Sequence, residues 1–145
     1  MTVVYFDSSA FIKLLIEEDG SELAALLWDR CDAAVSSRLA YPEVRAALAA
    51  ARRAHRLTAV GFSMAETAWD DYWASVRPVE LTASVTRHAG TLASTHALRG
   101  ADAVHLASAL AVGSVDPLLA VWDERLRRVA EDASLRVVPS AASAG

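Results

Sequence analysis

The chain has 145 residues, of which 54% are hydrophobic and 22% are charged, and its formal net charge is -4. This composition excludes an intrinsically disordered chain and gives no support to a globally basic nucleic-acid binder, and the length suits one compact domain. Cys31 is the single cysteine, so no disulfide can form within the chain. Because the sequence shows no leader-like N-terminus and no apolar run of membrane-spanning length, we expect a soluble, cytoplasmic protein without a membrane partner.

The first predicted element is a short apolar strand that ends at an acid. Residues 3–6 are apolar and of β type, and Asp7 follows them directly. In open α/β sheets, ligands bind outside the carboxyl ends of the strands, so Asp7 is a candidate site residue. The alternative at this point is that Asp7 or Ser8 simply caps a helix that begins near Ala10.

The next segments alternate between helices and a weak strand. The pattern predicts helices at residues 10–17 and 22–30, a weak strand at 33–36, and a long helix from about Leu39 to His55. Glu43 falls in the first turn of that long helix and lines up with Ala47 and Ala50. We therefore expect Glu43 to face a buried, small-residue side, where its carboxylate would need a partner.

Arginines lie on the other side of the same helix. Arg45, Arg52 and Arg56 are spaced so that they project in nearly one direction. Such a stripe is typical of a solvated helix face, and the alternative is a contact with RNA or an acidic partner.

An aromatic helix and an edge strand follow. Residues 58–76 are expected to be helical, with Trp69, Tyr72 and Trp73 on one stripe that forms either part of the core or a protein interface. Residues 77–81 predict a poor edge strand because Pro78 cannot donate to a sheet ladder. A helix is expected from about residue 83 to 97.

The last third repeats the pattern of a strand followed by an acid. Asp102 opens a helix at residues 101–110, where it either complements the helix dipole or serves a site, and His105 is expected to be a core or supporting histidine. The apolar run 118–122 ends at Asp123. A helix to about residue 133 and a strand at 135–138 complete a single domain, 1–139, and a flexible tail is expected at 140–145.

Alternation of strands and helices predicts an α/β fold whose parallel sheet gathers strand ends and helix starts along one edge. Four acids would arrive there: Asp7, Glu43, Asp102 and Asp123. Carboxylates about 5 Å apart repel by roughly 3 kcal/mol per pair at an effective dielectric constant near 20, so a divalent cation is expected among them. Oxygen ligands without cysteine or paired histidine favour Mg²⁺ or Mn²⁺.

With these acids and their flanking residues, the chain resembles a PIN-domain ribonuclease, and in particular the VapC-like toxins of type II toxin–antitoxin pairs. The resemblance covers nearly the whole chain and is carried by residues 5–10, 37–45, 98–107 and 121–126. It implies a three-layer α/β/α sandwich with a central, mainly parallel sheet of four to five strands. Trp122 departs from the pattern, because many relatives carry a small residue or Thr before the last acid.

The resemblance also implies a function for the acids. Asp7, Glu43, Asp102 and Asp123 would bind one or two Mg²⁺ or Mn²⁺ ions, and Ser9 would support the first acid. The implied reaction is metal-dependent endonucleolytic cleavage of RNA. The implied partners are a second copy of the chain in a homodimer and a cognate VapB-like antitoxin, whose C-terminal segment would cover the site. Trp28 and the aromatic stripe are candidates for those protein surfaces.

Two other functions remain open from the residues. A PIN-like module could hold RNA or protein without cutting, although all four acids are present. A phosphoryl-transfer domain could use Asp7 as a covalent acceptor, but Ser9 stands where phosphatases of the haloacid-dehalogenase type carry a second Asp, and Lys13 is the single lysine.

Overall fold

The computed structural model describes residues 1–113 and 116–140 and joins five strands in one sheet. The strands are β1 (Val3–Phe6), β2 (Ala33–Ser37), β3 (Val76–Val79), β4 (Leu118–Ala120) and β5 (Arg136–Val138). Their order is β3-β2-β1-β4-β5, and every neighbouring pair is parallel. The predicted α/β fold with a mainly parallel sheet is therefore confirmed, with all five strands parallel.

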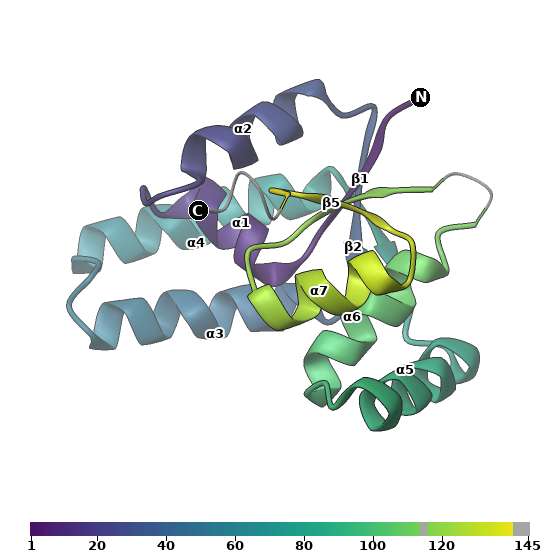
Figure 1. The fold of residues 1–145 in the computed structure, drawn as a ribbon. Helices are drawn as coiled ribbons and strands as arrows, with labels where there is room; N and C mark the ends of the chain where they lie inside the picture. Colours follow the sequence, from purple (N-terminus) through teal and green to yellow (C-terminus); the bar gives the residue numbers. More distant parts are fainter. Residues whose placement is uncertain (114–115, 141–145) are drawn as a thin grey trace.

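Each connection between successive strands contains one or two helices (Figure 1). They are α1 (Ser8–Leu15), α2 (Ser21–Arg30), α3 (Ala40–Arg53), α4 (Ala59–Ala74), α5 (Ala83–His96), α6 (Gly100–Leu110) and α7 (Glu124–Asp132). The predicted bounds differ from these by one or two residues at most ends. None of these helices is both long enough and apolar enough to cross a membrane.

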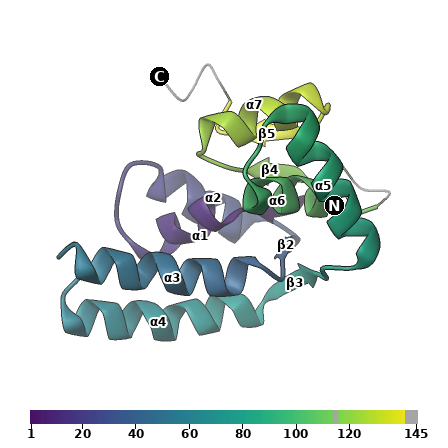
Figure 2. The same cartoon turned by 90° about the horizontal axis from the view of Figure 1, so that it is seen from below.

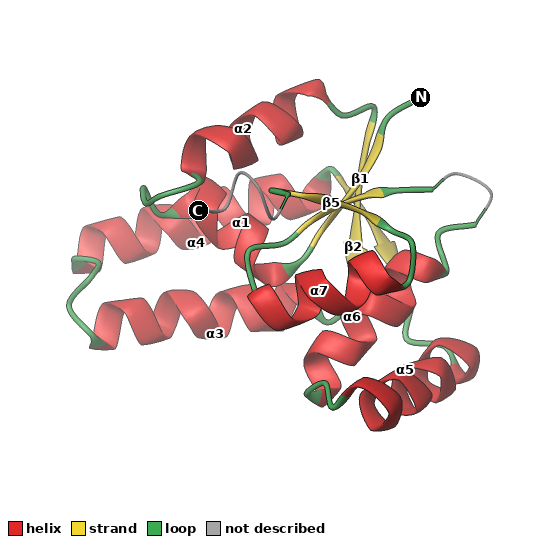
Figure 3. Cartoon of the chain, viewed as in Figure 1, coloured by secondary structure: helices red, strands yellow, loops and turns green. Residues whose placement is uncertain are grey.

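The sheet separates two apolar layers because successive strand residues point to opposite faces. Val3 and Tyr5 face one cluster, which is covered by α5, α6 and α7, whereas Val4 and Phe6 face the other, which is covered by α1, α3 and α4. Figure 3 shows the strands in yellow between these two sets of helices. The three-layer sandwich implied by the resemblance is thus present.

Helices α3 and α4 form an antiparallel pair that projects beyond the sheet, and they lie side by side in both views (Figures 1 and 2). Their shared interior includes Leu48 and Trp69, both fully buried. Trp69 is thus a core residue rather than a surface candidate.

The weakest predicted strand is buried along its whole length. All five residues of β2 are buried, and the Ser36 hydroxyl donates to the Phe6 carbonyl at 2.6 Å. This hydrogen bond lets a small polar residue occupy a strand between two others. Pro78 lies in β3 at the sheet edge, as predicted.

The strand order places a topological switch beside β1. Chain connections lead from β1 to β2 on one side, while β4 pairs with β1 on the other, with Phe6 opposite Ala120. The Asp7 N–H donates to the Ala120 carbonyl at 3.2 Å, which ties the two strand ends together. In open α/β sheets the ligand crevice lies at such a switch. Of the tail predicted at 140–145, only Ser140 lies within the described residues.

Candidate functional site

Strand ends and helix starts bring the four acids to one edge of the sheet. Asp7 follows β1 and accepts a hydrogen bond from the Ala10 N–H at 3.1 Å, so it caps α1. Asp123 lies just beyond β4 and accepts from the Leu126 N–H at 2.9 Å, so it caps α7. Glu43 and Asp102 lie in the first turns of α3 and α6. Capping and a site role are therefore compatible for Asp7.

Asp7 is the most buried of the four acids, with 5% of its surface exposed. Burial raises the pKa of Asp7 to about 6, and the nearby His105 imidazole and the hydrogen bonds from Ser9 and Ala10 offset only part of that effect. Ser9 Oγ donates to Asp7 Oδ1 at 2.6 Å and accepts from the Trp122 N–H at 3.3 Å. Ser9 thus links the first acid to the loop that carries Asp123.

Glu43 is half-buried and receives two hydrogen bonds on the same oxygen. His105 Nε2 lies 2.6 Å from Glu43 Oε1, and Ser8 Oγ donates to Oε1 at 2.7 Å. Burial by itself would raise the pKa of Glu43, but these hydrogen bonds and nearby positive charge outweigh it, so the pKa lies below its ordinary value. Glu43 is therefore held as a carboxylate.

The other two acids share one arginine. Arg99 Nε lies 3.0 Å from Asp102 Oδ2, and an Arg99 terminal nitrogen lies 3.8 Å from Asp123 Oδ2. The Arg99 side chain is 75% exposed, so solvent screens these contacts. The charge of this guanidinium also favours the ionised form of Glu43. Arg99 thus places a single positive charge among the acids.

The donor chemistry of this edge fits a hard divalent cation. Four carboxylates and the Ser9 hydroxyl supply oxygen atoms alone, which Mg²⁺ and Mn²⁺ prefer. Asp7 is buried, and no salt bridge pairs it with lysine or arginine within residues 1–113 and 116–140. In the same described part of the chain, no three carboxylate, imidazole or thiol groups converge into a ready-made cation cage.

Known proteins share this chain's pattern over nearly its whole length. A family model described as "PIN domain" matches residues 4–132. Two Mycobacterium tuberculosis proteins, named "Ribonuclease VapC45" and "Ribonuclease VapC49", are each 65% identical over 140 residues, covering 97% of this chain and 97% of each relative. The chain belongs to the PIN domain family. A third M. tuberculosis protein, "Ribonuclease VapC35", is 35% identical over 140 residues and covers 94% of this chain.

A solved structure supports the PIN fold from a distant sequence. The VapBC2 crystal structure from Rickettsia felis, bound to a DNA fragment from its promoter, matches with a TM-score of 0.65 at 11% identity. The match covers 94% of this chain and 97% of that one. The VapC-like interpretation is confirmed by the family model and the close relatives, and the fold by this structure.

Glu43 was predicted to be buried because it lines up with Ala47 and Ala50, and that reason was wrong. Ala47 and Ala50 are exposed, and the buried side of α3 is formed by Ala40, Val44 and Leu48. Alanine tolerates both environments, so its alignment with Glu43 carried no burial signal. Glu43 is instead partly buried because the first turn of α3 packs against His105 and Ser8.

Ser8 and Arg99 were not among the predicted site residues, and His105 was predicted only as a core or supporting histidine, without a partner. Their signals in the sequence were weak. His105 stands one turn after Asp102 and is 3% exposed in its side chain, and Arg99 directly precedes the helix that carries Asp102. Position along the chain does not reveal that either side chain reaches an acid on another element.

The three arginines of the predicted stripe, Arg45, Arg52 and Arg56, each make a contact within the PIN domain. Arg45 pairs with Glu66, and Arg56 pairs with Glu18 at 3.0 Å. Arg52 lies over the Phe62 ring. Arg45 and Arg52 thus contact α4, whereas Arg56 contacts the connection between α1 and α2, and the side chains of Arg45 and Arg56 remain 40% and 56% exposed.

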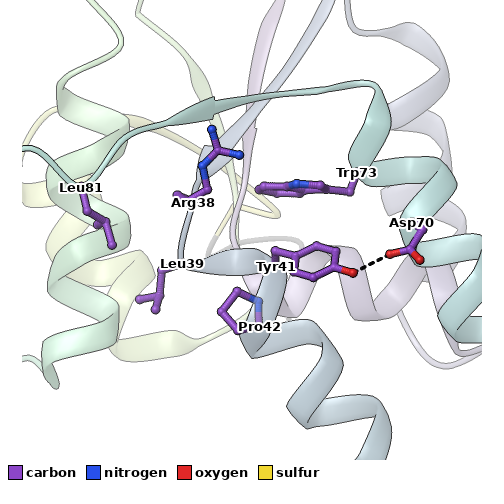
Figure 4. A pocket seen from close by; sticks show the side chains of 7 residues that line it. All are labelled: Arg38, Leu39, Tyr41, Pro42, Asp70, Trp73 and Leu81. Atoms are coloured by element: carbon purple, nitrogen blue, oxygen red, sulfur yellow. Dashed lines mark hydrogen bonds between the residues drawn. The ribbon is translucent and has the colours of Figure 1, made fainter.

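An apolar groove adjoins the Glu43 end of α3. Its volume is about 630 Å³, and it is lined by Arg38, Leu39, Tyr41, Pro42, Asp70, Trp73 and Leu81. Figure 4 shows Leu39 and Leu81 on one side and Tyr41 and Trp73 on the other, with the Tyr41 hydroxyl donating to Asp70. Trp73 thus reaches a surface, and Trp28 and Tyr72, which pack edge-to-face against each other, line a second, separate surface pocket.

Proposed function

We propose that this protein is a metal-dependent endoribonuclease that acts as the toxin of a toxin–antitoxin pair. The observation that carries the proposal is the set of four acids at the switch point of the PIN sheet. The 65% identity to two proteins named as VapC ribonucleases supports the activity and the class of substrate.

Each acid has a role in this proposal. Asp7, Glu43, Asp102 and Asp123 would hold one or two Mg²⁺ or Mn²⁺ ions, and Ser9 would orient Asp7 through its 2.6 Å hydrogen bond. When bound, the cation would supply an activated water and neutralise charge that develops at phosphorus. Asp7 and Asp123 would keep their positions through the caps they make on α1 and α7.

The PIN domain is proposed to work with protein partners in the cytoplasm. By analogy with VapC relatives, we expect a homodimer and a VapB-like antitoxin that covers the acidic edge. A short upstream reading frame of antitoxin type would support this pairing. We also treat residues 1–139 as a single domain, since both apolar layers lie on one sheet.

Cleavage of RNA by the purified chain tests the proposal. We expect cleavage with Mg²⁺ or Mn²⁺, none with EDTA, and at least a hundredfold lower rate for Asp7→Asn. Asp29→Asn, at an exposed position on α2, is the matched control and should cleave like the parent. Equal cleavage by Asp7→Asn and the parent would reject the assigned site.

Calorimetry separates the enzyme from a non-catalytic PIN module. The enzyme is expected to bind Mn²⁺ in the millimolar range or tighter, and Asp7→Asn is expected to bind it more weakly. A parent chain that bound RNA but neither bound Mn²⁺ nor cut RNA would be a binding module instead.

A further inference from the structure

A buried hydrogen-bond chain runs from the sheet interior to Glu43. Tyr5 on β1 is fully buried, and its hydroxyl lies 2.8 Å from His105 Nδ1 on α6. The other ring nitrogen, His105 Nε2, lies 2.6 Å from Glu43 Oε1 on α3. Three elements that are distant in the sequence are thus connected through one imidazole.

The hydrogen-bond partners of Tyr5 determine which nitrogen of His105 carries the proton. The Tyr5 oxygen accepts a hydrogen bond from the Ser37 N–H at 3.1 Å, and a phenol keeps its own proton at neutral pH. The single Tyr5 proton is then donated to His105 Nδ1. Nε2 consequently carries the imidazole N–H and donates it to Glu43.

Both hydrogen bonds to Glu43 end on one carboxylate oxygen. His105 Nε2–H and the Ser8 hydroxyl converge on Oε1, and no hydrogen bond within the described part of the chain reaches Oε2. This arrangement fixes the rotation of the carboxylate and leaves its second oxygen available. Groups that orient a metal ligand in this way commonly change metal affinity when they are removed.

We propose that His105 is a positioning residue that holds Glu43 with Oε1 committed to hydrogen bonds and Oε2 available to a divalent cation. This inference rests on the proposed function, because it assumes that Glu43 is a cation ligand. The competing role is that of a core histidine, which would affect stability but not the affinity for the cation.

Imidazole nitrogen spectra of the metal-free protein test the hydrogen-bond chain directly. Comparison with His105→Gln assigns the His105 signals among the four histidines. We expect the Nε2–H form for His105 near neutral pH. A ring protonated at Nδ1 alone would overturn the proposal, because Nε2 could then not donate to Glu43.

Mn²⁺ affinity, measured by calorimetry, tests the consequence. We expect a roughly 10- to 100-fold loss in His105→Leu, which removes both ring nitrogens, and partial recovery in His105→Gln, whose amide N–H replaces the Nε2 donor. Ser21→Ala is the control. Ser21 is a buried serine on α2, its hydroxyl bonds to Ile16 and Glu18 in the connection between α1 and α2 and not to the acids or His105, and its loss should leave the affinity unchanged.

The outcomes separate this proposal from the proposed function. Parent-like Mn²⁺ affinity in a folded His105→Leu protein, or an equal loss in Ser21→Ala, would overturn the positioning role while RNA cleavage by the parent still stood. Absence of Mn²⁺ binding by the parent would overturn both. If the affinities change as expected but the parent does not cut RNA, the positioning role stands and the nuclease proposal fails. Thermal unfolding in EDTA shows that each variant is folded.

Discussion

Replacing Asp7 with asparagine is expected to stabilise the folded protein at pH 8 in EDTA, although the same change should impair cleavage. Burial raises the pKa of Asp7 from 3.8 to about 6. The folded state therefore binds this proton more tightly than the unfolded state does. The stability that this proton contributes is complete below pH 3.8 and is lost as the pH rises through about 6. A shift of about two pKa units corresponds to about 3 kcal/mol.

Asparagine removes the buried charge and keeps the local hydrogen bonds. Its amide oxygen can accept from Ser9 and from the Ala10 N–H, and asparagine caps helices as well as aspartate does. We expect Asp7→Asn to be up to about 3 kcal/mol more stable than the parent at pH 8, which raises the unfolding midpoint by roughly 6–10 °C for a domain of this size. The two midpoints should converge near pH 4, where Asp7 of the folded parent is protonated.

Thermal unfolding followed by circular dichroism measures this difference across pH. Asp29→Asn provides the control, because an exposed carboxylate should change stability by less than about 0.5 kcal/mol at any pH. Saturating Mn²⁺ should raise the midpoint of the parent more than that of Asp7→Asn, since ligand binding to the folded state is linked to stability. A less stable Asp7→Asn protein at pH 8, or a difference independent of pH, would refute the reasoning.

Three further predictions concern the edge of the sheet. Arg99→Ala should bind Mn²⁺ more tightly in calorimetry, because the guanidinium competes with a cation for the Asp102 and Asp123 carboxylates. Asp123→Asn should keep the α7 cap and lose cleavage, whereas Asp123→Ala should also lose about 1 kcal/mol of stability in urea unfolding. Gly20→Ala should cost more than about 2 kcal/mol in the same assay, because Gly20 has a φ of +95° and an added Cβ would lie 2.7 Å from Trp122 Nε1.

Each of these predictions has an opposing result. Unchanged or weaker Mn²⁺ binding by Arg99→Ala would mean that this guanidinium does not compete for the acids. Cleavage by Asp123→Asn at the parent rate would remove Asp123 from the site. Gly113→Ala is the control for Gly20, because Gly113 also has a positive φ but an added Cβ meets no atom within 4 Å. Equal costs at the two glycines would show that contact with Trp122 contributes nothing.

Local patterns sufficed to predict the parts of the site that depend on neighbours in the sequence. Asp7 and Asp123 each follow a short apolar run, and both the strand and the cap arise within a few residues. Pro78 indicated an edge strand for a reason that is also local, because proline has no N–H to donate to a sheet ladder. The order of these elements, together with the flanking motifs, was enough to predict the parallel sheet.

Such local patterns could not predict the contacts between elements that are far apart in the chain. The burial of Glu43 was inferred from Ala47 and Ala50, which are exposed, because alanine does not distinguish the core from the surface. The partners of Glu43, by contrast, come from α1 and α6, 35 and 62 residues away in the chain. Nothing in the spacing of His105 indicates that its ring joins Tyr5 to Glu43.

The two kinds of contact explain why the site can be positioned before a cation arrives. The caps on α1 and α7 hold Asp7 and Asp123 through backbone N–H groups, which are present whatever the charge at the edge. The negative charge of the acids is not balanced within the fold, because Arg99 is exposed and Asp7 is buried with a pKa raised to about 6. In the proposed enzyme, the fold therefore supplies the position of each acid, and a divalent cation relieves the repulsion and desolvation that this position imposes. It follows that replacing an acid with its amide should separate stability from activity, since the amide keeps the hydrogen bonds and removes only the charge.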